Sequence, residues 1–281
     1  MRHSEHGFTL IEAVLVIAVT GVLFAVVAQF IVPPVQAYLA TVARAGMVDQ
    51  ADLSLRRIGR DLRAALPNSV RVNGTGLEIE FIPVTAGARY ATEGSGALDF
   101  GTVDTSFDVV GPALTVTASQ PLVFYNLGPG VSGADAYAAS TTAGEQAASN
   151  RRVATNAAGS AAGSATTLTI SSLAGLPVGN FAPPYRVLAV GQPVTYRCDL
   201  GTGRLTRYTG YGFIATQPDP PSGGSSAVLA TGVSACRFSV DGTLVAARSA
   251  LVNLRLALSA STSAGSETVT LHHAVFAENL P

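Results

Sequence analysis

A single carboxylate stands at the start of the most apolar stretch of the sequence. Ala13 to Val35 carries no charge and is rich in Val, Leu, Ile, Ala and Phe, and Glu12 directly precedes it. On insertion scales, a carboxylate at the centre of a membrane helix costs about 2.5–3.5 kcal/mol, and less near the helix end. Because of this cost, a charge in such a segment usually serves a function, and Glu12 is the first candidate.

The other side chains that could do chemistry form no known catalytic or metal-binding pattern. The sequence has no Ser-His-Asp signature, G-x-S-x-G, phosphate loop, HExxH or paired CxxC motif. His272 and His273 are adjacent in a predicted strand and point to opposite faces, so they cannot chelate one metal together. Asp99, Asp104 and Asp108 lack the spacing of a calcium loop, and we read them as solvated loop carboxylates. We therefore expect no catalytic residue, no cofactor and no metal.

The two cysteines, Cys198 and Cys236, lie in one β-rich region. This placement fits a single disulfide in an oxidising compartment, with free core thiols as the alternative. Charged residues make up 12% of the 281 residues, and the net charge is −1. The chain therefore gives no electrostatic reason to bind nucleic acid.

The apolar run is long enough to cross a membrane as a helix. Its ~23 residues would span ~34 Å, against ~30 Å for the hydrocarbon core. A secretory signal peptide would be shorter and would end in a small-residue cleavage site, whereas this run continues into Pro33-Pro34. An ordinary signal anchor is the alternative. Arg2 and Arg44 are the nearest basic residues on its two sides, so the positive-inside rule does not decide the orientation.

The apolar run leads into an amphipathic segment from Val35 to Leu66. Apolar residues recur at three- and four-residue steps, and Arg and Asp residues occupy the opposite positions. We read the arginines as a solvated helix face rather than as a lipid or nucleic-acid patch. Pro67 ends the helix, and Pro33-Pro34 should kink it because each proline removes a backbone donor. Together the two segments predict one helix of roughly sixty residues.

The rest of the chain predicts an antiparallel sheet. Leu77, Ile79 and Phe81 alternate with glutamates after the turn at 73–76, so we expect a hairpin with one buried face. Residues 128–166 are mostly Ala, Ser, Gly and Thr, which indicates an exposed or partly disordered insertion. The fold class is therefore α+β, with the long N-terminal helix packed on an antiparallel β-sheet. The predicted strands are 70–72, 77–81, 98–100, 107–110, 122–126, 194–198, 204–208, 236–240, 243–245, 252–258 and 269–275.

The segment Gly7-Phe8-Thr9-Leu10-Ile11-Glu12, with the apolar run behind it, resembles the class III signal of type IV pilins and type II secretion pseudopilins. The resemblance implies that residues 1–7 are a leader peptide. It implies that a membrane prepilin peptidase cuts after Gly7 and methylates the new amine of Phe8. It also implies that Glu12 pairs with the terminal amine of a neighbouring subunit, which makes Glu12 the candidate assembly residue.

The same resemblance divides the chain into the parts of a pilin-like fold. Residues 8–35 would form the transmembrane and filament-core half of the helix, 36–66 the half in the globular domain, and 67–281 the β-rich periplasmic domain with a flexible insertion near 128–166. The protein would cross the bacterial inner membrane once and then enter a pilus at the cell surface. Its partners would be the prepilin peptidase, other major and minor pilins, the inner-membrane assembly platform and membrane lipid.

Scattered segments narrow the resemblance to minor pilins of the mannose-sensitive haemagglutinin (MSHA) biogenesis system. Minor pilins of the PilW type and type II secretion pseudopilins of the GspJ type share the general plan and remain alternatives. A pilus-borne adhesin or ligand-binding module that uses the insertion is a further alternative, and a membrane-tethered enzyme is the least favoured. The segments are 54–58, 60–61, 65–72, 104–109, 123–128, 134–137, 196–198, 207–208, 211–212, 267–271 and 279–281.

Overall fold

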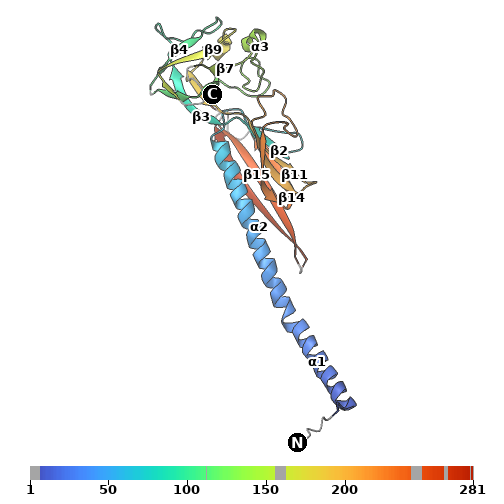
Figure 1. The fold of residues 1–281 in the computed structure, drawn as a ribbon. Helices are drawn as coiled ribbons and strands as arrows, with labels where there is room; N and C mark the ends of the chain where they lie inside the picture. Colours follow the sequence, from blue (N-terminus) through green and yellow to red (C-terminus); the bar gives the residue numbers. More distant parts are fainter. Residues whose placement is uncertain are drawn as a thin grey trace. The chain divides into compact units, whose positions relative to one another are not determined.

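The chain opens with two helices, and strands dominate the rest (Figure 1). The computed structural model describes residues 7–111, 113–155, 163–241, 249–262, 265–278 and 280. The chain falls into two compact units, one made of Met1–Asp49 with Ser259–Val269 and the other of Gln50–Leu258 with Thr270–Pro281.

Helix α1 (Leu10–Phe30) exposes its apolar side chains. Thr9 caps its start, because the Thr9 hydroxyl accepts a hydrogen bond from the N–H of Glu12 at 3.4 Å and the Thr9 carbonyl accepts from Glu12 and Ala13. No residue of α1 is buried. By length and composition, the helical region that begins at Leu10 could cross a membrane.

A break of one residue, Ile31, separates α1 from α2 (Val32–Arg63). Pro33 and Pro34 follow this break at once, and they lack the N–H groups that would bond to the carbonyls four residues earlier. The long N-terminal helical region is thus confirmed, and its interruption lies just before the two prolines rather than at them.

Within the first unit, α2 contacts the tip of a β-hairpin formed by β15 (Ser249–Thr262) and β16 (Gly265–Glu278). The Arg44 guanidinium Nη2 lies 2.5 Å from Glu267 Oε2, and the Arg44 side chain is 60% exposed. The hydroxyl groups of Ser259 and Thr268 lie 2.8 Å apart. Because exposed ion pairs contribute about 0–1 kcal/mol, the Arg44–Glu267 pair adds little stability.

Within the second unit, α2 buries the apolar face that its spacing predicts and exposes its arginines. The buried helical residues are Ala51, Leu55, Ile58 and Leu62, and the exposed arginines are Arg56, Arg57, Arg60 and Arg63. Gly59 lies against β16, where a Cβ atom at Gly59 would be 2.9 Å from Nε2 of His273. His272 is exposed and His273 is half-buried, so the two imidazoles occupy opposite faces of the strand.

A five-stranded antiparallel sheet holds β2 between two other strands, β1 and β11. The prediction of one buried face is wrong for this strand, because all four residues of β2 are buried and both Glu78 and Glu80 are 0% exposed. The sheet order is β1 (Arg71–Val72), β2 (Glu78–Phe81), β11 (Val194–Asp199), β12 (Arg204–Thr209) and β13 (Ser225–Thr231).

A closed barrel forms the other large part of the second unit, and the sequence did not predict it. In Figure 1, β3, β4, β7 and β9 gather in one part of this unit, and β2, β11 and β14 in another. The barrel core includes Tyr90, Phe107, Leu122 and Phe124. The barrel order is β10 (Arg186–Val190), β3 (Val84–Tyr90), β4 (Ser106–Val110), β9 (Thr167–Ser171), β7 (Arg151–Ala154) and β6 (Pro121–Phe124).

Two smaller sheets and two short helices complete the described elements. The predicted strand 98–100 is reduced to one isolated bridge between Phe100 and Leu176. The remaining elements are the sheet β14 (Val233–Asp241), β15 and β16, the pair β5 (Leu114–Val116) and β8 (Gly163–Ala165), helix α3 (Ala143–Ala147) and the 3-10 helix η1 (Val178–Asn180).

The segment 128–166 has more structure than its composition predicts. Asp135, Tyr137 and Arg152 are buried, and α3 begins with a capping box in which Thr142 and Glu145 bond reciprocally. Residues 156–162 of this segment, the predicted strand 243–245 and leader residues 1–6 lie outside the described residues.

Candidate functional site

The peptide bond between Gly7 and Phe8 lies outside the helix and is exposed. Helix α1 begins two residues later, at Leu10, and 69% of Phe8 is exposed. Apart from its chain neighbours, no atom of the described residues lies within 4 Å of the position that a Cβ of Gly7 would take. On the side of residue 8 onward, neither helical hydrogen bonds nor side chains packed on Gly7 obstruct this bond.

Glu12 is the acidic residue in the first turn of α1. It is exposed, and no other charged residue occurs between Phe8 and Ala43. A carboxylate at a helix N-terminus interacts favourably with the helix dipole, typically by about 0.3–1 kcal/mol. Glu12 thus places one negative charge beside the point where the helix starts, at the end nearest Phe8.

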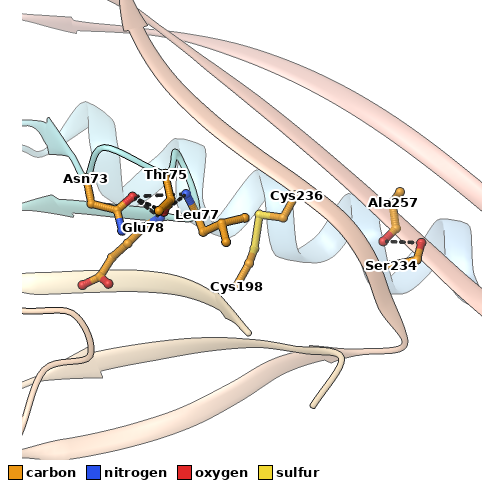
Figure 2. Close-up of a disulfide and its surroundings, with 8 residues drawn as sticks. All are labelled: Asn73, Thr75, Leu77, Glu78, Cys198, Ser234, Cys236 and Ala257. Carbon is orange, nitrogen blue, oxygen red and sulfur yellow. Dashed lines mark hydrogen bonds between the residues drawn. A yellow bond between two sulfur atoms is a disulfide. The ribbon is translucent and has the colours of Figure 1, made fainter. Parts of the chain in front are cut away.

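Cys198 and Cys236 are joined by a disulfide that links two sheets (Figure 2). Cys198 lies on β11 of the five-stranded sheet and Cys236 on β14 of the three-stranded sheet. The same two sheets are also joined by a backbone hydrogen bond of 2.7 Å from the N–H of Phe238 to the carbonyl of Gly76. Leu77, next to this turn, accepts a hydrogen bond from the Cys198 N–H at 2.9 Å. The disulfide therefore holds together two sheets that are also joined by backbone hydrogen bonds.

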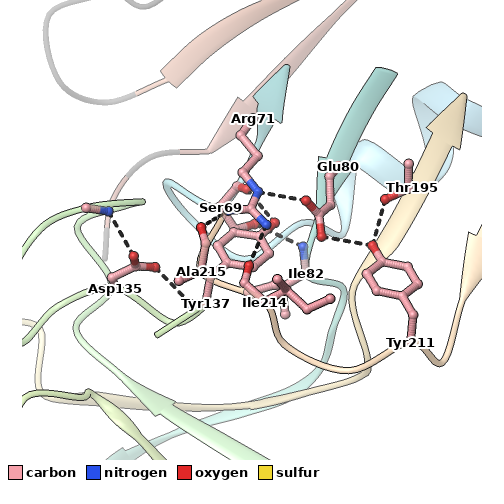
Figure 3. Close-up of polar contacts among 11 residues, drawn as sticks. Ser69, Arg71, Glu80, Ile82, Asp135, Tyr137, Thr195, Tyr211, Ile214 and Ala215 are labelled. Carbon is pink, nitrogen blue, oxygen red and sulfur yellow. Dashed lines mark hydrogen bonds and ion pairs between the residues drawn. The ribbon is translucent and has the colours of Figure 1, made fainter. Parts of the chain in front are cut away.

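Arg71 on β1 and Glu80 on β2 are directly opposite each other and form a buried ion pair (Figure 3). Arg71 Nε lies 2.7 Å from Glu80 Oε2, and the Tyr211 hydroxyl donates to Glu80 Oε1 at 2.9 Å. Burial raises the pKa of Glu80, and the bonds from Arg71 and Tyr211 oppose that rise. The carboxylate is thus held by two donors that compensate part of its desolvation.

Arg71 also ties two loops to the five-stranded sheet. Its Nη1 and Nη2 groups donate to the carbonyls of Ala215 and Ile214 at 2.6 and 2.8 Å. Its guanidinium carbon lies 3.7 Å from the centre of the Tyr137 ring, whose hydroxyl donates to the Ser69 carbonyl (Figure 3). Because the polar atoms in this network bond within the protein, we read it as a structural support and not as a reactive site.

A second buried carboxyl, Glu78, lies near Asp219. Neither Glu78 oxygen has a hydrogen-bond partner among the described residues, and Arg197 Nε is 3.8 Å from Oε2. Asp219 accepts from Arg197 Nε at 3.0 Å and from Asn73 Nδ2 at 2.7 Å. The pKa of Glu78 is raised to about 8, chiefly by burial and further by the nearby charges of Asp219 and Glu80. Glu78 is therefore a neutral acid at neutral pH.

Arg152, a residue of the barrel strand β7, is fully buried. Its Nη1 group donates to the carbonyls of Ser149 and Arg151, and its Nη2 group donates to those of Gln146 and Ala174, all at 2.8–3.0 Å. Burial lowers the pKa of Arg152 to about 10. Arg152 therefore links two backbone segments, 146–151 and the one at Ala174, through four carbonyls, three of which also accept hydrogen bonds from other donors.

The structure does not bring the sequence-predicted aspartates and histidines together. Asp104 accepts hydrogen bonds from the backbone of Asp99 and Ser106, and Asp108 accepts one from Thr167. Within the described ranges, no three or more His, Cys, Asp or Glu side chains are placed to hold a metal ion.

The sequence alone did not predict the buried charged residues. Only the Arg71–Glu80 pair could have been recognised from a local sequence pattern. The turn at 73–76 sets the register of β1 and β2, and this register places Arg71 opposite Glu80. The partners Tyr211, Asp219 and Tyr137 are more than 50 positions from the residues of β1 and β2 that they lie beside, and no local pattern identifies them.

Comparison with known proteins gives one match, to the N-terminal segment. Residues 2–28 match the prokaryotic N-terminal methylation motif. This match indicates a type IV pilin-like or pseudopilin precursor, and it implies processing by a prepilin peptidase and pilin partners. No curated protein and no solved structure matches the chain.

Proposed function

We propose that this pilin-like precursor is a minor pilin that is cut after Gly7, methylated at Phe8, and used to assemble or prime a type IV pilus of the MSHA kind. Its sequence most resembles the MSHA minor pilin MshO. We further propose that the protein crosses the inner membrane once, with its β-rich part in the periplasm, until it enters the pilus. In this proposal it works by assembly and not by catalysis, and binds no nucleic acid.

The observation that carries the proposal is the isolation of Glu12. It is the one charge in a helical segment whose apolar side chains are exposed, and it lies five residues after Gly7. Cleavage after Gly7 would create a positive amine at Phe8, one helical turn from Glu12. In a bundle of such helices, this carboxylate and the amine of a neighbouring subunit would neutralise each other. Leaving one of two buried charges unpaired costs about 3–5 kcal/mol, so the pair would set the subunit position.

The exposed Gly7–Phe8 bond supports the processing step. A side chain at position 7 would crowd the backbone where a peptidase must approach it, whereas glycine leaves the bond accessible. We expect mass spectrometry of the mature protein to find methylated Phe8 at its N-terminus. Gly7→Val should leave the leader attached, and Gly21→Val, at an equally open position in α1, should not. An intact Met1 in the wild-type protein would exclude this proposal.

The assembly step is tested with Glu12→Ala. Cleaved protein in membranes is compared with protein in sheared pili, at equal expression, for the wild type and the variant. We expect normal cleavage, normal membrane insertion and reduced pilus incorporation. Thr20→Ala changes a polar residue of the same helix and should be incorporated normally. Equal incorporation of Glu12→Ala and wild type would show that Glu12 is not the assembly residue.

The same preparations separate the alternatives. A type II secretion pseudopilin of the GspJ kind would be cleaved and methylated but would be absent from pili, and its loss would stop protein secretion. A pilus-borne adhesin would enter pili, and its loss would leave pilus number unchanged while surface attachment falls.

A further inference from the structure

Two arginines lie directly opposite each other on the outside of the barrel. Arg186 on β10 pairs with Arg89 on β3, and both side chains are exposed. The neighbouring residues of β3 and β10, such as Tyr90 and Val187, point into the barrel core. Directly opposed residues of an antiparallel pair have Cβ atoms about 4.5–5.5 Å apart, so two positive charges at these positions repel each other.

No acidic side chain compensates this pair. Neither guanidinium forms an ion pair or hydrogen bond with any residue in the described part of the chain. Asp108, on the adjacent strand β4, uses its Oδ1 atom to accept a bond from the Thr167 hydroxyl. The two arginines therefore form a local positive charge without a partner from the protein.

An apolar hollow of about 430 Å³ lies beside the two arginines. Val110 is opposite Arg89 on β4, so Arg186, Arg89 and Val110 form one row across three strands, and Val110 is 58% exposed. In the next row Gly87 is opposite Leu188, and a Cβ at Gly87 would be 2.7 Å from Leu188 Cδ2. Gly87 therefore leaves room for the Leu188 side chain, which covers it and gives the hollow an apolar floor.

We propose that this hollow binds a small organic oxyanion, a carboxylate or phosphate attached to a short hydrocarbon group. The oxyanion would accept hydrogen bonds from both guanidinium groups, whose planar donors match carboxylate and phosphate oxygens. The hydrocarbon group would lie on Val110 and on the Leu188 side chain that covers Gly87. Binding relieves the repulsion between the arginines, so the ligand stabilises the barrel that it binds.

The test uses the full chain in non-ionic detergent at low salt, with the thermal unfolding midpoint as readout. The probes are inorganic phosphate, n-butyl phosphate and n-butanol. We expect a saturable rise in Tm with both phosphates, at a lower concentration for n-butyl phosphate, and none with n-butanol. Arg89→Gln and Arg186→Gln should each weaken the apparent affinity by about tenfold or more, which corresponds to one charge-assisted contact.

Arg204→Gln is the matched control, because Arg204 is also exposed at the start of a strand and also has no ion pair. It should respond to the probes as the wild type does. Val110→Ser should reduce the preference for n-butyl phosphate and leave the affinity for inorganic phosphate unchanged. Without any probe, Arg89→Gln and Arg186→Gln should raise Tm relative to Arg204→Gln, because each removes the repulsion.

Two results would overturn the proposal. One is an equal response of Arg204→Gln and the two Arg-pair variants, which would mean that phosphate acts on general surface charge. The other is the lack of any saturable response in the wild-type protein.

Discussion

Glu78 and Asp219 are two carboxyl groups that lie beside one guanidinium, that of Arg197. The Arg197 guanidinium faces both groups, at 3.8 Å from Glu78 Oε2 and 3.0 Å from Asp219 Oδ1. Glu80, two residues along the same strand, adds a further negative charge nearby. The proton on Glu78 is therefore what allows two carboxyl groups to share one cation.

This pair makes stability depend on pH. The folded pKa of Glu78, about 8, lies above its ordinary value near 4.5, so its contribution is fully present below about 4.5 and is lost as pH rises through about 8. Glu78→Gln replaces the acid with a neutral donor of similar shape. We expect Glu78→Gln to unfold near the wild-type Tm at pH 5 and several degrees above it at pH 9, since one pH unit of pKa displacement is worth about 1.4 kcal/mol.

The measurement is thermal unfolding followed by circular dichroism between pH 5 and pH 9. Glu93→Gln is the control, because Glu93 is exposed. The difference in Tm between Glu93→Gln and wild type should not change with pH. A constant difference between Glu78→Gln and wild type over this range would show that Glu78 is ionised throughout.

Gly59→Ala should destabilise the protein despite the helix propensity of alanine. In an open helical position this change would gain about 1 kcal/mol, but here the new methyl group meets the His273 imidazole at 2.9 Å. We expect a net loss of about 1 kcal/mol in the free energy of unfolding, as overpacking costs about 1–3 kcal/mol. Gly46→Ala, on the same helix with no atom within 4 Å, should instead stabilise.

A double-mutant cycle with His273→Ala identifies the clash. Removal of the imidazole should turn Gly59→Ala from destabilising to stabilising. If Gly59→Ala costs the same with and without His273, another contact causes the loss.

Arg152→Met should destabilise the barrel by at least about 3 kcal/mol. The variant keeps an apolar stem but removes four hydrogen bonds from a charged donor, and hydrogen bonds to charged groups contribute about 1.5–3 kcal/mol each. Chemical denaturation measures the change, and Arg204→Met, at an exposed site, should stay within about 0.5 kcal/mol of wild type. A similar small effect of both variants would mean that water replaces the guanidinium.

Reduction of the disulfide should lower stability without changing the fold. Cys198 and Cys236 are 38 positions apart, and closing a loop of this size is worth about 4 kcal/mol in the chain-entropy model. We expect the double variant Cys198→Ser/Cys236→Ser to lose about this amount relative to oxidised wild type, and to match wild type in reductant. Non-reducing peptide mapping of protein from cells should find the linked pair. Alkylation of both cysteines without prior reduction would contradict this expectation.

The sequence predicts those features that depend on neighbouring residues. The spacing of Leu55, Ile58 and Leu62 identifies the buried face of α2, and the turn at 73–76 identifies the hairpin of β1 and β2. With only two cysteines in the chain, a disulfide could have one pairing. Pro33 and Pro34 place the helix interruption to within two residues.

The barrel could not be predicted because its strands lack a strong pattern and its pairings are long-range. Strand β9 (Thr167–Ser171) continues a stretch of small polar residues, and β10 pairs with β3 across about 100 positions. The burial of both faces of β2 could not be predicted from the sequence for a related reason. Glutamate at 78 and 80 is typical of a solvated face, and its burial depends on Arg71 together with the distant residues Arg197 and Tyr211.

The disulfide has a mechanical consequence for a chain that is pulled from its ends. Tension cannot extend the segment between Cys198 and Cys236, because the covalent bond carries the load past it. At about 3.4 Å per extended residue, these 38 positions would otherwise release roughly 130 Å of slack. Strand β12, the whole of β13 and the start of β14 lie inside this bypassed segment. A stretched molecule would therefore keep these strands tethered at their base until the sulfur–sulfur bond is reduced.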